Sequence, residues 1–219
     1  MPSLLVQASG KRLCQFPAIG VDMAGLVLEA TPEEETPARL LILGSRLLGG
    51  ASVESLTWFD DVLMGGTELS VTSVPSDDSD PPRENVRSDT TEGDARQGEL
   101  QRAFAKMDAG TIAPRSVHIP LPWETLAFRV MAGDEVLCLA AVTEERPLLS
   151  LSALWDRWHP ESLWLSASSG PQGWPPKPDE GHRWLDQRVK LDRQLRVTII
   201  GEKPERQRRS RRLNGPSDR

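Results

Sequence analysis

The sequence predicts a mainly β fold: an antiparallel β-sandwich or barrel with one or two short helices, a long disordered acidic insertion and a basic tail. Short runs suited to strands recur along the chain, and glycine or proline separates them. Over the first 74 residues, no helical periodicity extends across ten positions. The chain has 219 residues, of which 38% are hydrophobic, so it can bury a core without disulfides.

The first 74 residues contain the candidate strands of the N-terminal half. Turn-forming residues such as Gly20, Gly44 and Gly66 separate them. Leucine is frequent in these runs, although it favours strands less than valine or isoleucine does. The segments span residues 3–7, 11–16, 25–30, 39–43, 55–59 and 67–74.

Residues 75–99 differ from the rest of the chain in composition. They hold eight acidic residues and three arginines, and apart from prolines only Val86 and Ala95 are apolar. Such a stretch buries too little apolar surface to offset the entropy lost on ordering. We therefore expect a disordered acidic insertion at 75–99.

Two short helices are expected in the second half. Over 99–107, apolar residues recur at the i, i+3, i+4 and i+7 positions of one helical face. A second short helix is expected over 147–158, stopped by Pro160. The apolar face of the first helix consists of Leu100, Ala103, Phe104 and Met107.

Strands are expected around these helices. Gly133 and Asp134 form a turn signal between two apolar runs, which predicts a hairpin. Residues 184–200 are expected to form one or two strands. The other expected strands span 116–121, 125–131, 135–143 and 163–167.

Charge divides the chain into an acidic body and a basic tail. The formal net charge is −6. Residues 202–219 carry seven basic and three acidic side chains, or +4, so the remainder carries −10. We expect a single β-rich domain over 1–200, interrupted at 75–99, and a disordered basic tail over 201–219. The acidic body disfavours nucleic-acid binding across the folded surface, because it repels phosphate.

The sequence carries no recognisable catalytic or cofactor motif. It has no CxxC or HxxxH zinc pattern, no GxSxG turn and no phosphate-binding glycine loop. Its three histidines are isolated and are expected on the surface or in loops. Cys14 and Cys138 lie in apolar runs and are expected to be buried free thiols. No cofactor, metal ligand or catalytic residue is assigned.

Two segments are the candidates for partner contacts. Trp174 lies among prolines in a loop and is the tryptophan most expected to be exposed. The arginines of the tail can bind phosphate or carboxylate through bidentate pairs, and in a eukaryote such a run serves as a nuclear-import signal. The tail candidates are Arg206, Arg208, Arg209, Arg211 and Arg212.

Residues 58–67 resemble a family signature. They are similar to the Trp…Asp-x-Val-Met-Gly-Gly-x-Ser pattern of the complex I intermediate-associated protein 30 family, a galactose-binding-like β-sandwich. Leu63 departs from the pattern by standing between Val62 and Met64, and Thr67 follows the glycines. The resemblance covers only these ten residues, and no function is carried over from it.

The sequence thus predicts a non-enzymatic intracellular protein-binding or scaffold subunit that acts through other protein subunits. The N-terminus lacks the features of a signal peptide, and no run of 18 apolar residues exists, so we expect the cytoplasm or nucleus and no membrane. Two alternatives stay open. One is a nucleic-acid accessory factor that uses the arginine-rich tail, and the other is an enzyme whose site converges from distant positions.

Overall fold

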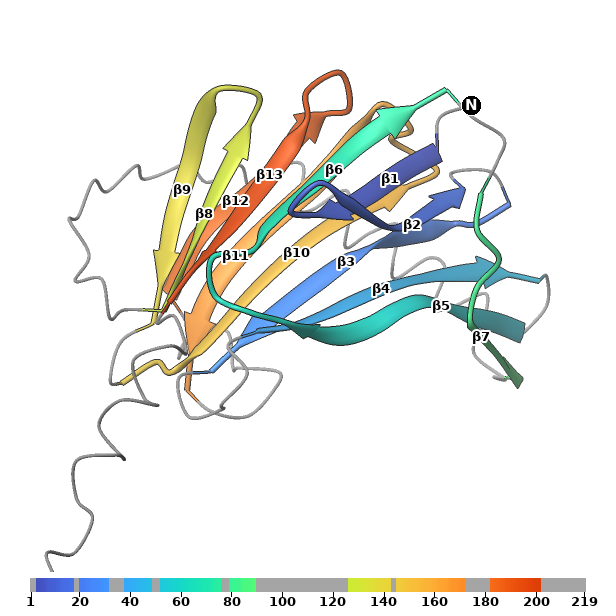
Figure 1. The fold of residues 1–219 in the computed structure, drawn as a ribbon. Coiled ribbons are helices and arrows are strands. Elements are labelled where there is room, and N and C mark those ends of the chain that lie inside the picture. Colours follow the sequence, from blue (N-terminus) through green and yellow to red (C-terminus); the bar gives the residue numbers. More distant parts are fainter. Residues whose placement is uncertain are drawn as a thin grey trace, which may run out of the picture.

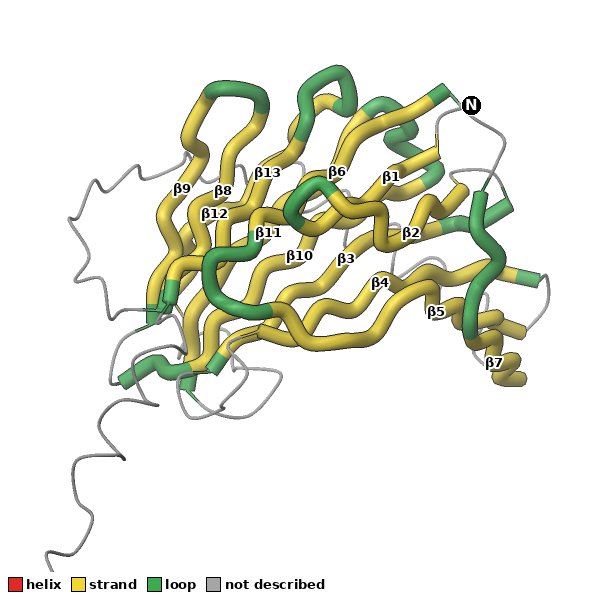
Figure 2. The backbone as a smooth tube through the Cα atoms, viewed as in Figure 1, coloured by secondary structure: helices red, strands yellow, loops and turns green. Residues whose placement is uncertain are grey.

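The computed structural model describes residues 3–17, 20–31, 38–48, 52–75, 79–89, 126–142, 145–171 and 182–201. Within these ranges the chain forms thirteen strands and no helix. The strands build two antiparallel sheets, as Figures 1 and 2 show. The prediction of a mainly β, antiparallel fold is confirmed.

One sheet has six strands in the order β2-β1-β6-β13-β8-β9. Its central strands come from both ends of the chain, because β6 pairs with β1 on one side and with β13 on the other. The strands are β1 (Ser3–Ala8), β2 (Lys11–Pro17), β6 (Glu68–Val74), β8 (Ala127–Ala132), β9 (Glu135–Ala141) and β13 (Leu195–Ile200).

The other sheet has seven strands in the order β12-β11-β10-β3-β4-β5-β7. In Figure 1, β7 lies at the lower right, at the end of this sheet. The strands are β3 (Met23–Ala30), β4 (Ala38–Leu47), β5 (Ser52–Leu63), β7 (Glu84–Asp89), β10 (Leu148–Asp156), β11 (Ser162–Gly170) and β12 (His182–Lys190).

Both sheets contribute to one hydrophobic core. The strands alternate, so that Leu26 and Leu28 of β3 are buried in the core while Val27 between them is partly exposed. Phe128 and Val130 of β8 enter the same core from the other sheet. This period of two places every second side chain of a strand inside, which is the pattern that antiparallel sheets require.

The predicted hairpin around Gly133 is confirmed. β8 and β9 pair from Ala127↔Ala141 to Ala132↔Glu135, with Gly133 and Asp134 in the turn between them. Gly133 has a φ of 58°, which glycine adopts without the strain that a Cβ would add. Residues 184–200 contain parts of two strands, β12 and β13, which lie in different sheets.

The predicted helix over 147–158 is wrong, because this segment contains strand β10. Leu149, Leu151, Ala153 and Trp155 are all buried, at alternate positions. The serines between them lie on the opposite face of the sheet. Pairing with β3 on one side and β11 on the other satisfies the backbone, and this tertiary context overrides the helical propensity of leucine.

The prediction of disorder throughout 75–99 is wrong for residues 79–89. These residues are described, and 84–89 form β7, which pairs with β5. Their order comes from polar and backbone bonds to both sheets rather than from apolar burial. Residues 76–78 and 90–99 lie outside the described residues, as do the expected helix at 99–107 and the expected strand at 116–121.

None of the described segments is a helix long and apolar enough to span a membrane. The expected division into a domain at 1–200 and a tail at 201–219 stays a prediction, since residues beyond 201 are not described.

Candidate partner-binding site at the edge of β5 and β7

Residues 79–83 form a segment that we call the strap, and its first attachment is to β2. The backbone N–H of Asp80 donates to the carbonyl of Gln15 at 2.7 Å. In return, the N–H of Gln15 donates to Oδ2 of Asp80 at 2.7 Å, and Arg12 donates to Oδ1 at 2.8 Å. Asp80 therefore occupies the outer edge of the six-stranded sheet.

The second attachment of the strap is to β5 in the other sheet. The indole N–H of Trp58 donates to the carbonyl of Asp80 at 3.0 Å. The N–H of Arg83 donates to the carbonyl of Thr57 at 2.7 Å, and its guanidinium lies 5.3 Å from the centre of the Phe59 ring. The strap thus ties the edge of one sheet to the edge of the other, where β2 and β5 are in contact.

Trp58 owes its position to an irregularity in β5. The pairing of β4 with β5 shifts between Ile42↔Phe59 and Leu43↔Thr57, which leaves Trp58 as the extra residue of a β-bulge. Its ring packs over Gly44, where a Cβ would come within 2.9 Å of it, and lies 5.6 Å from the ring of Phe16. The bulge turns Trp58 inward beneath the strap.

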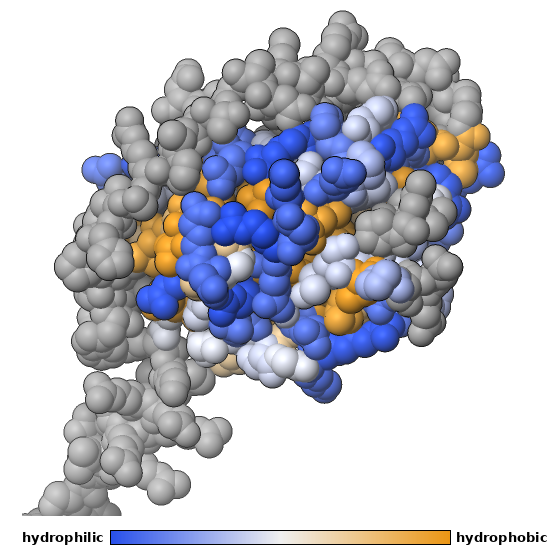
Figure 3. Space-filling view, turned by 90° about the horizontal axis from the view of Figure 1, so that it is seen from above, coloured by the Kyte–Doolittle hydropathy of each residue, from blue (hydrophilic) through white to orange (hydrophobic). Residues whose placement is uncertain are grey.

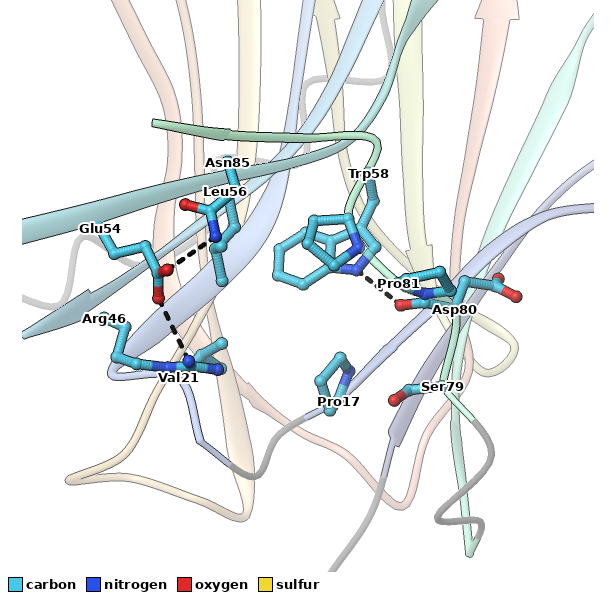
Figure 4. A pocket seen from close by; sticks show the side chains of 11 residues that line it. Pro17, Val21, Arg46, Glu54, Leu56, Trp58, Ser79, Asp80, Pro81 and Asn85 are labelled. Atoms are coloured by element: carbon cyan, nitrogen blue, oxygen red, sulfur yellow. Dashed lines mark hydrogen bonds and ion pairs between the residues drawn. The ribbon is translucent and has the colours of Figure 1, made fainter. Parts of the chain in front are cut away.

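A pocket of about 350 Å³ opens beneath the strap, and Figure 4 shows its lining. Its volume is at the low end of the range for ligand sites. A volume of this size suits one side chain or one small molecule. The apolar walls are Pro17, Val21, Leu56, Trp58, Pro81 and Pro82, and the polar lining is Arg46, Glu54, Ser79, Asp80 and Asn85.

Three of these polar residues form a chain across one end of the pocket. The amide of Asn85 donates to Oε1 of Glu54 at 2.7 Å. Oε2 of Glu54 lies 3.1 Å from Nη1 of Arg46 but makes no well-aligned hydrogen bond, although it is buried. Nε of Arg46 donates to the carbonyl of Gly20. The pocket therefore offers both an acceptor and a cation beside its apolar walls.

The pocket borders the open end of the seven-stranded sheet. Asn85, which lines the pocket, belongs to β7, and among the described residues no strand pairs with the outer edge of β7. Val86 on the opposite face is 48% exposed. Backbone groups on such an edge can pair with a further strand.

A second polar cluster surrounds Asp156 at the end of β10. Oδ1 of Asp156 accepts from the backbone N–H groups of Trp158 and His159, each at 3.0 Å, and lies 2.9 Å from Nδ1 of His159. Oδ2 accepts from Arg188 at 3.1 Å. The carboxylate is fully buried, and these bonds replace the water that it loses.

A neighbouring carboxylate, Asp22, extends this cluster. It is 5% exposed, accepts from the N–H of Leu47 at 2.5 Å and forms an ion pair with Arg157. Arg157 in turn lies 5.0 Å from the centre of the Trp158 ring. Sequence reasoning missed both aspartates. For Asp156 the usable signal was an aspartate that begins a short segment ending in Pro160, since aspartate caps its own turn in this way.

The structure also shows the surroundings of the two cysteines and of two adjacent aspartates in β5. Burial raises the pKa of the Cys14 and Cys138 thiols to about 12, so these free thiols stay protonated near neutral pH. Asp60 and Asp61, adjacent carboxylates of β5, are both exposed, and Asp60 accepts two hydrogen bonds from Arg39 at 2.8 and 2.7 Å. Over the described ranges, no group of three or more His, Cys, Asp or Glu residues is arranged to hold a metal ion.

The residues predicted to contact partners lie outside the described residues. This holds for Trp174 and for all five tail arginines, Arg206, Arg208, Arg209, Arg211 and Arg212. The face in Figure 3 is mostly hydrophilic over the described residues, with hydrophobic residues visible in patches between hydrophilic ones. The large exposed hydrophobic residues of the described part are Leu48, Val62, Met64, Val86 and Val136.

Comparisons with known proteins give no relative. No protein-family model, no curated protein and no solved structure matches the chain. The site above therefore rests on its own geometry.

Proposed function

We propose that this protein is a non-enzymatic binding or scaffold subunit that works through protein partners. The observation that carries the proposal is the open edge of β7 beside a small pocket. Strand addition at such an edge gives affinity through main-chain hydrogen bonds, and an adjacent pocket gives specificity by accepting a side chain. The pocket of about 350 Å³ has the size for this role.

Three other edge strands support this choice by contrast. β2, β9 and β12 each carry one extra residue in their pairing: Leu13, Leu137 and Trp184 respectively. The strap also bonds to the backbone of Gln15 in β2, and β9 contacts β12 of the opposite sheet. Bulges and covered edges prevent strand addition, whereas β7 pairs with β5 without any shift.

The carboxylates of the site support a binding role over a catalytic one. Glu54 contacts Arg46, and Asp80 is held by Arg12 and the backbone of Gln15. Each of these two carboxylates already has an arginine as its ion-pair partner, so its charge stabilises the protein itself and is not directed at a substrate. This is the arrangement expected of a rigid contact surface.

We further infer a β-sandwich rather than a barrel. Two separate sheets with their own edges surround the core, whereas a barrel closes one sheet on itself. We also propose an intracellular location, in the cytoplasm or the nucleus. The two free cysteines, neither of them in a disulfide, support it.

The test is a nuclease-treated affinity purification from the native cell. It compares the full chain, a chain ending at Gly201, the variant Val86→Lys and the matched variant Val62→Lys, which changes a similarly exposed valine of β5, outside β7. Defined protein partners that survive nuclease support the proposal, and their loss on truncation assigns the contact to the basic tail.

Two outcomes would overturn the proposed function. If nuclease removes everything recovered, the nucleic-acid alternative replaces it, with Arg206–Arg212 on phosphate. If nothing is recovered with any chain, the scaffold proposal fails, and a screen for a small-molecule ligand of the pocket follows.

A further inference from the structure

The outer face of the seven-stranded sheet carries a band of apolar side chains. The band lies on β4, β3, β10 and β11, at positions that alternate with core residues, and each of its side chains is partly exposed. An antiparallel sheet whose outer face meets water carries polar side chains there, so an apolar outer face is suited to a further layer of the protein. The members of this outer band are Val27, Leu41, Leu43, Leu154 and Trp164.

Strand pairing makes the outer band continuous. Leu154 pairs with Trp164 on one side and with Gly25 on the other. Gly25 pairs in turn with Leu43, and a Cβ on this glycine would come within 2.8 Å of Cδ2 of Leu154. The Leu154 side chain therefore lies over the glycine. Four neighbouring strands, β11, β10, β3 and β4, thus contribute apolar residues or glycine to one row.

The outer face of the six-stranded sheet differs in character. On its central strands β6 and β13, the side chains that lie between core residues are polar: Ser70, Arg196 and Thr198. Such a face is stable in contact with water. An apolar layer would therefore pack on the seven-stranded sheet rather than on this one.

Residues 90–125, which lie outside the described residues, join two distant edges of the sandwich. The segment follows Asp89 of β7, at the open edge of the seven-stranded sheet. It leads to β8, which pairs with β9, and β9 contacts β12 at the other edge of the seven-stranded sheet. In Figure 1, β7 lies at the lower right and β8 at the left. The connection therefore spans the width of the sandwich.

The two junctions also lie at opposite ends of the strands. Successive pairings across the seven-stranded sheet place Lys190, the last residue of β12, at the same end as Asp89. A short turn leads from Lys190 to Leu195 of β13, which pairs with Ala132, the last residue of β8. The first residue of β8 therefore lies at the other end. A direct path between the two junctions crosses a face of the sandwich diagonally.

We propose that residues 99–107 form a helix that packs on the outer band as a third layer. The apolar face expected for this helix, which Leu100, Ala103, Phe104 and Met107 form, supplies the matching surface. A helix of nine residues is about 14 Å long, and the three spacings between the four strands of the band also add up to about 14 Å. This inference concerns a different surface from the edge of β7 and does not depend on the proposed function.

The rest of the segment suits a connecting role. Residues 90–98 contain a single apolar side chain, Ala95, and residues 111–125 contain three prolines, which interrupt a helix. Nine residues precede the proposed helix and eighteen follow it. At about 3.3 Å per extended residue, both stretches are long enough to reach β7 and β8 from the middle of the sheet.

The test measures how fast a thiol in the outer band of the full chain is alkylated. Val27→Cys places the thiol opposite Leu41, and peptide mass spectrometry assigns each rate. Adding Phe104→Asp, in the apolar face of the proposed helix, should raise the rate at the new thiol about tenfold, because the cover opens more often. The neighbouring variant Ala105→Asp, on the opposite face of that helix, should leave the rate unchanged.

Two controls make this result specific. Ser70→Cys places a thiol on the outer face of the six-stranded sheet, and Phe104→Asp should leave its alkylation rate unchanged. The native thiols of Cys14 and Cys138 are buried. Their continued protection shows that the sandwich stays folded in each variant.

A cross-link tests the contact without disrupting it. In the double variant Val27→Cys with Phe104→Cys, a short bismaleimide should join the two thiols within one chain, since each thiol adds across one maleimide double bond. The matched pair Ser70→Cys with Phe104→Cys should give no cross-link. The peptide that links positions 27 and 104 is identified by its mass.

Three results would overturn the inference. One is an unchanged rate at Val27→Cys when Phe104→Asp is added, and another is an equal rise with Ala105→Asp. The third is a rate increase or a cross-link at Ser70→Cys in place of Val27→Cys, which would assign the segment to the six-stranded sheet. None of these results bears on the partners recovered from cells, so the proposed function is tested separately.

Discussion

The cluster at Asp156 and the site at Glu54 are two ways of placing charge at the ends of one sheet. Asp156 is fully buried, and four donors surround it. Glu54 retains 15% exposure, and one of its oxygens has no aligned donor. A carboxylate with four donors holds a turn in place, whereas one whose main charged partner is a half-exposed arginine is held more weakly. The two regions therefore differ in what their removal should cost.

The largest effect is expected for Asp156→Ala. The change removes the buried carboxylate that accepts from Arg188 and from two backbone N–H groups, so we expect a loss of about 3–5 kcal/mol of unfolding free energy. Urea denaturation followed by tryptophan fluorescence measures it. Asp134→Ala, at an exposed carboxylate 3.4 Å from Arg196, is the control and should change little. Equal losses for the two variants would remove the distinction between the regions.

A smaller loss is expected for Asp80→Ala in the strap. It removes the acceptor of the Gln15 N–H and the partly exposed ion pair with Arg12, for a cost of about 2 kcal/mol. The same urea titration measures the cost. Asp60→Ala removes a carboxylate that is also held by an arginine but ties no two sheets together. If Asp80→Ala costs no more than this control, the strap does not link the sheets.

Glu54→Gln should cost about 1 kcal/mol, since its partner Arg46 is 44% exposed and solvent weakens the pair. A double-mutant cycle with Arg46→Ala isolates the coupling between the two side chains. A coupling near that of Asp156 with Arg188 would show that the pocket end is as structural as the turn. A coupling of zero would show that Arg46 contributes through its hydrogen bond to the carbonyl of Gly20 and not through Glu54.

The smallest effect concerns Asp60. Hydrogen bonds from Arg39 lower the pKa of Asp60 below its ordinary value. A lowered pKa in the folded state contributes stability that is present above the unfolded pKa and is lost as pH falls through the folded one. Arg39→Ala should return the pKa of Asp60 towards its ordinary value, measured by NMR titration of the carboxyl carbon. Because the pair is exposed, stability should change by less than about 0.5 kcal/mol.

Much of the fold follows from the sequence because alternation and turn residues are local signals. The segment at 11–16 anticipates β2, and Gly133 with Asp134 anticipates the β8–β9 hairpin. The strand β10 was predicted as a helix because its leucine-rich run before Pro160 favours one, whereas its neighbours on both sides impose a strand. The strand β3 is more than 100 residues away from β10 in the chain, so a local stretch of sequence does not reveal this pairing.

The candidate site was not predictable for a related reason. Asp80 lies in a stretch whose composition favours disorder, and its order depends on Gln15 and Trp58, which are 65 and 22 residues away in the chain. The composition of a segment indicates how much apolar surface it can bury. It does not indicate which hydrogen-bond partners residues far away in the chain will provide. The pocket, the open edge of β7 and the bulge at Trp58 all belong to this class.

The strap also affects how often the thiol of Cys14 becomes accessible to solvent. Cys14 lies directly before the residue that the strap holds, and the Asp80 carboxylate adds to the burial that raises its pKa. Each time the strap detaches, that restraint is released, whereas Cys138, also buried, lies on β9 at the opposite edge of the six-stranded sheet from β2. The ratio of the alkylation rate at Cys14 to that at Cys138 therefore measures how frequently the edge at the strap opens relative to the edge at β9.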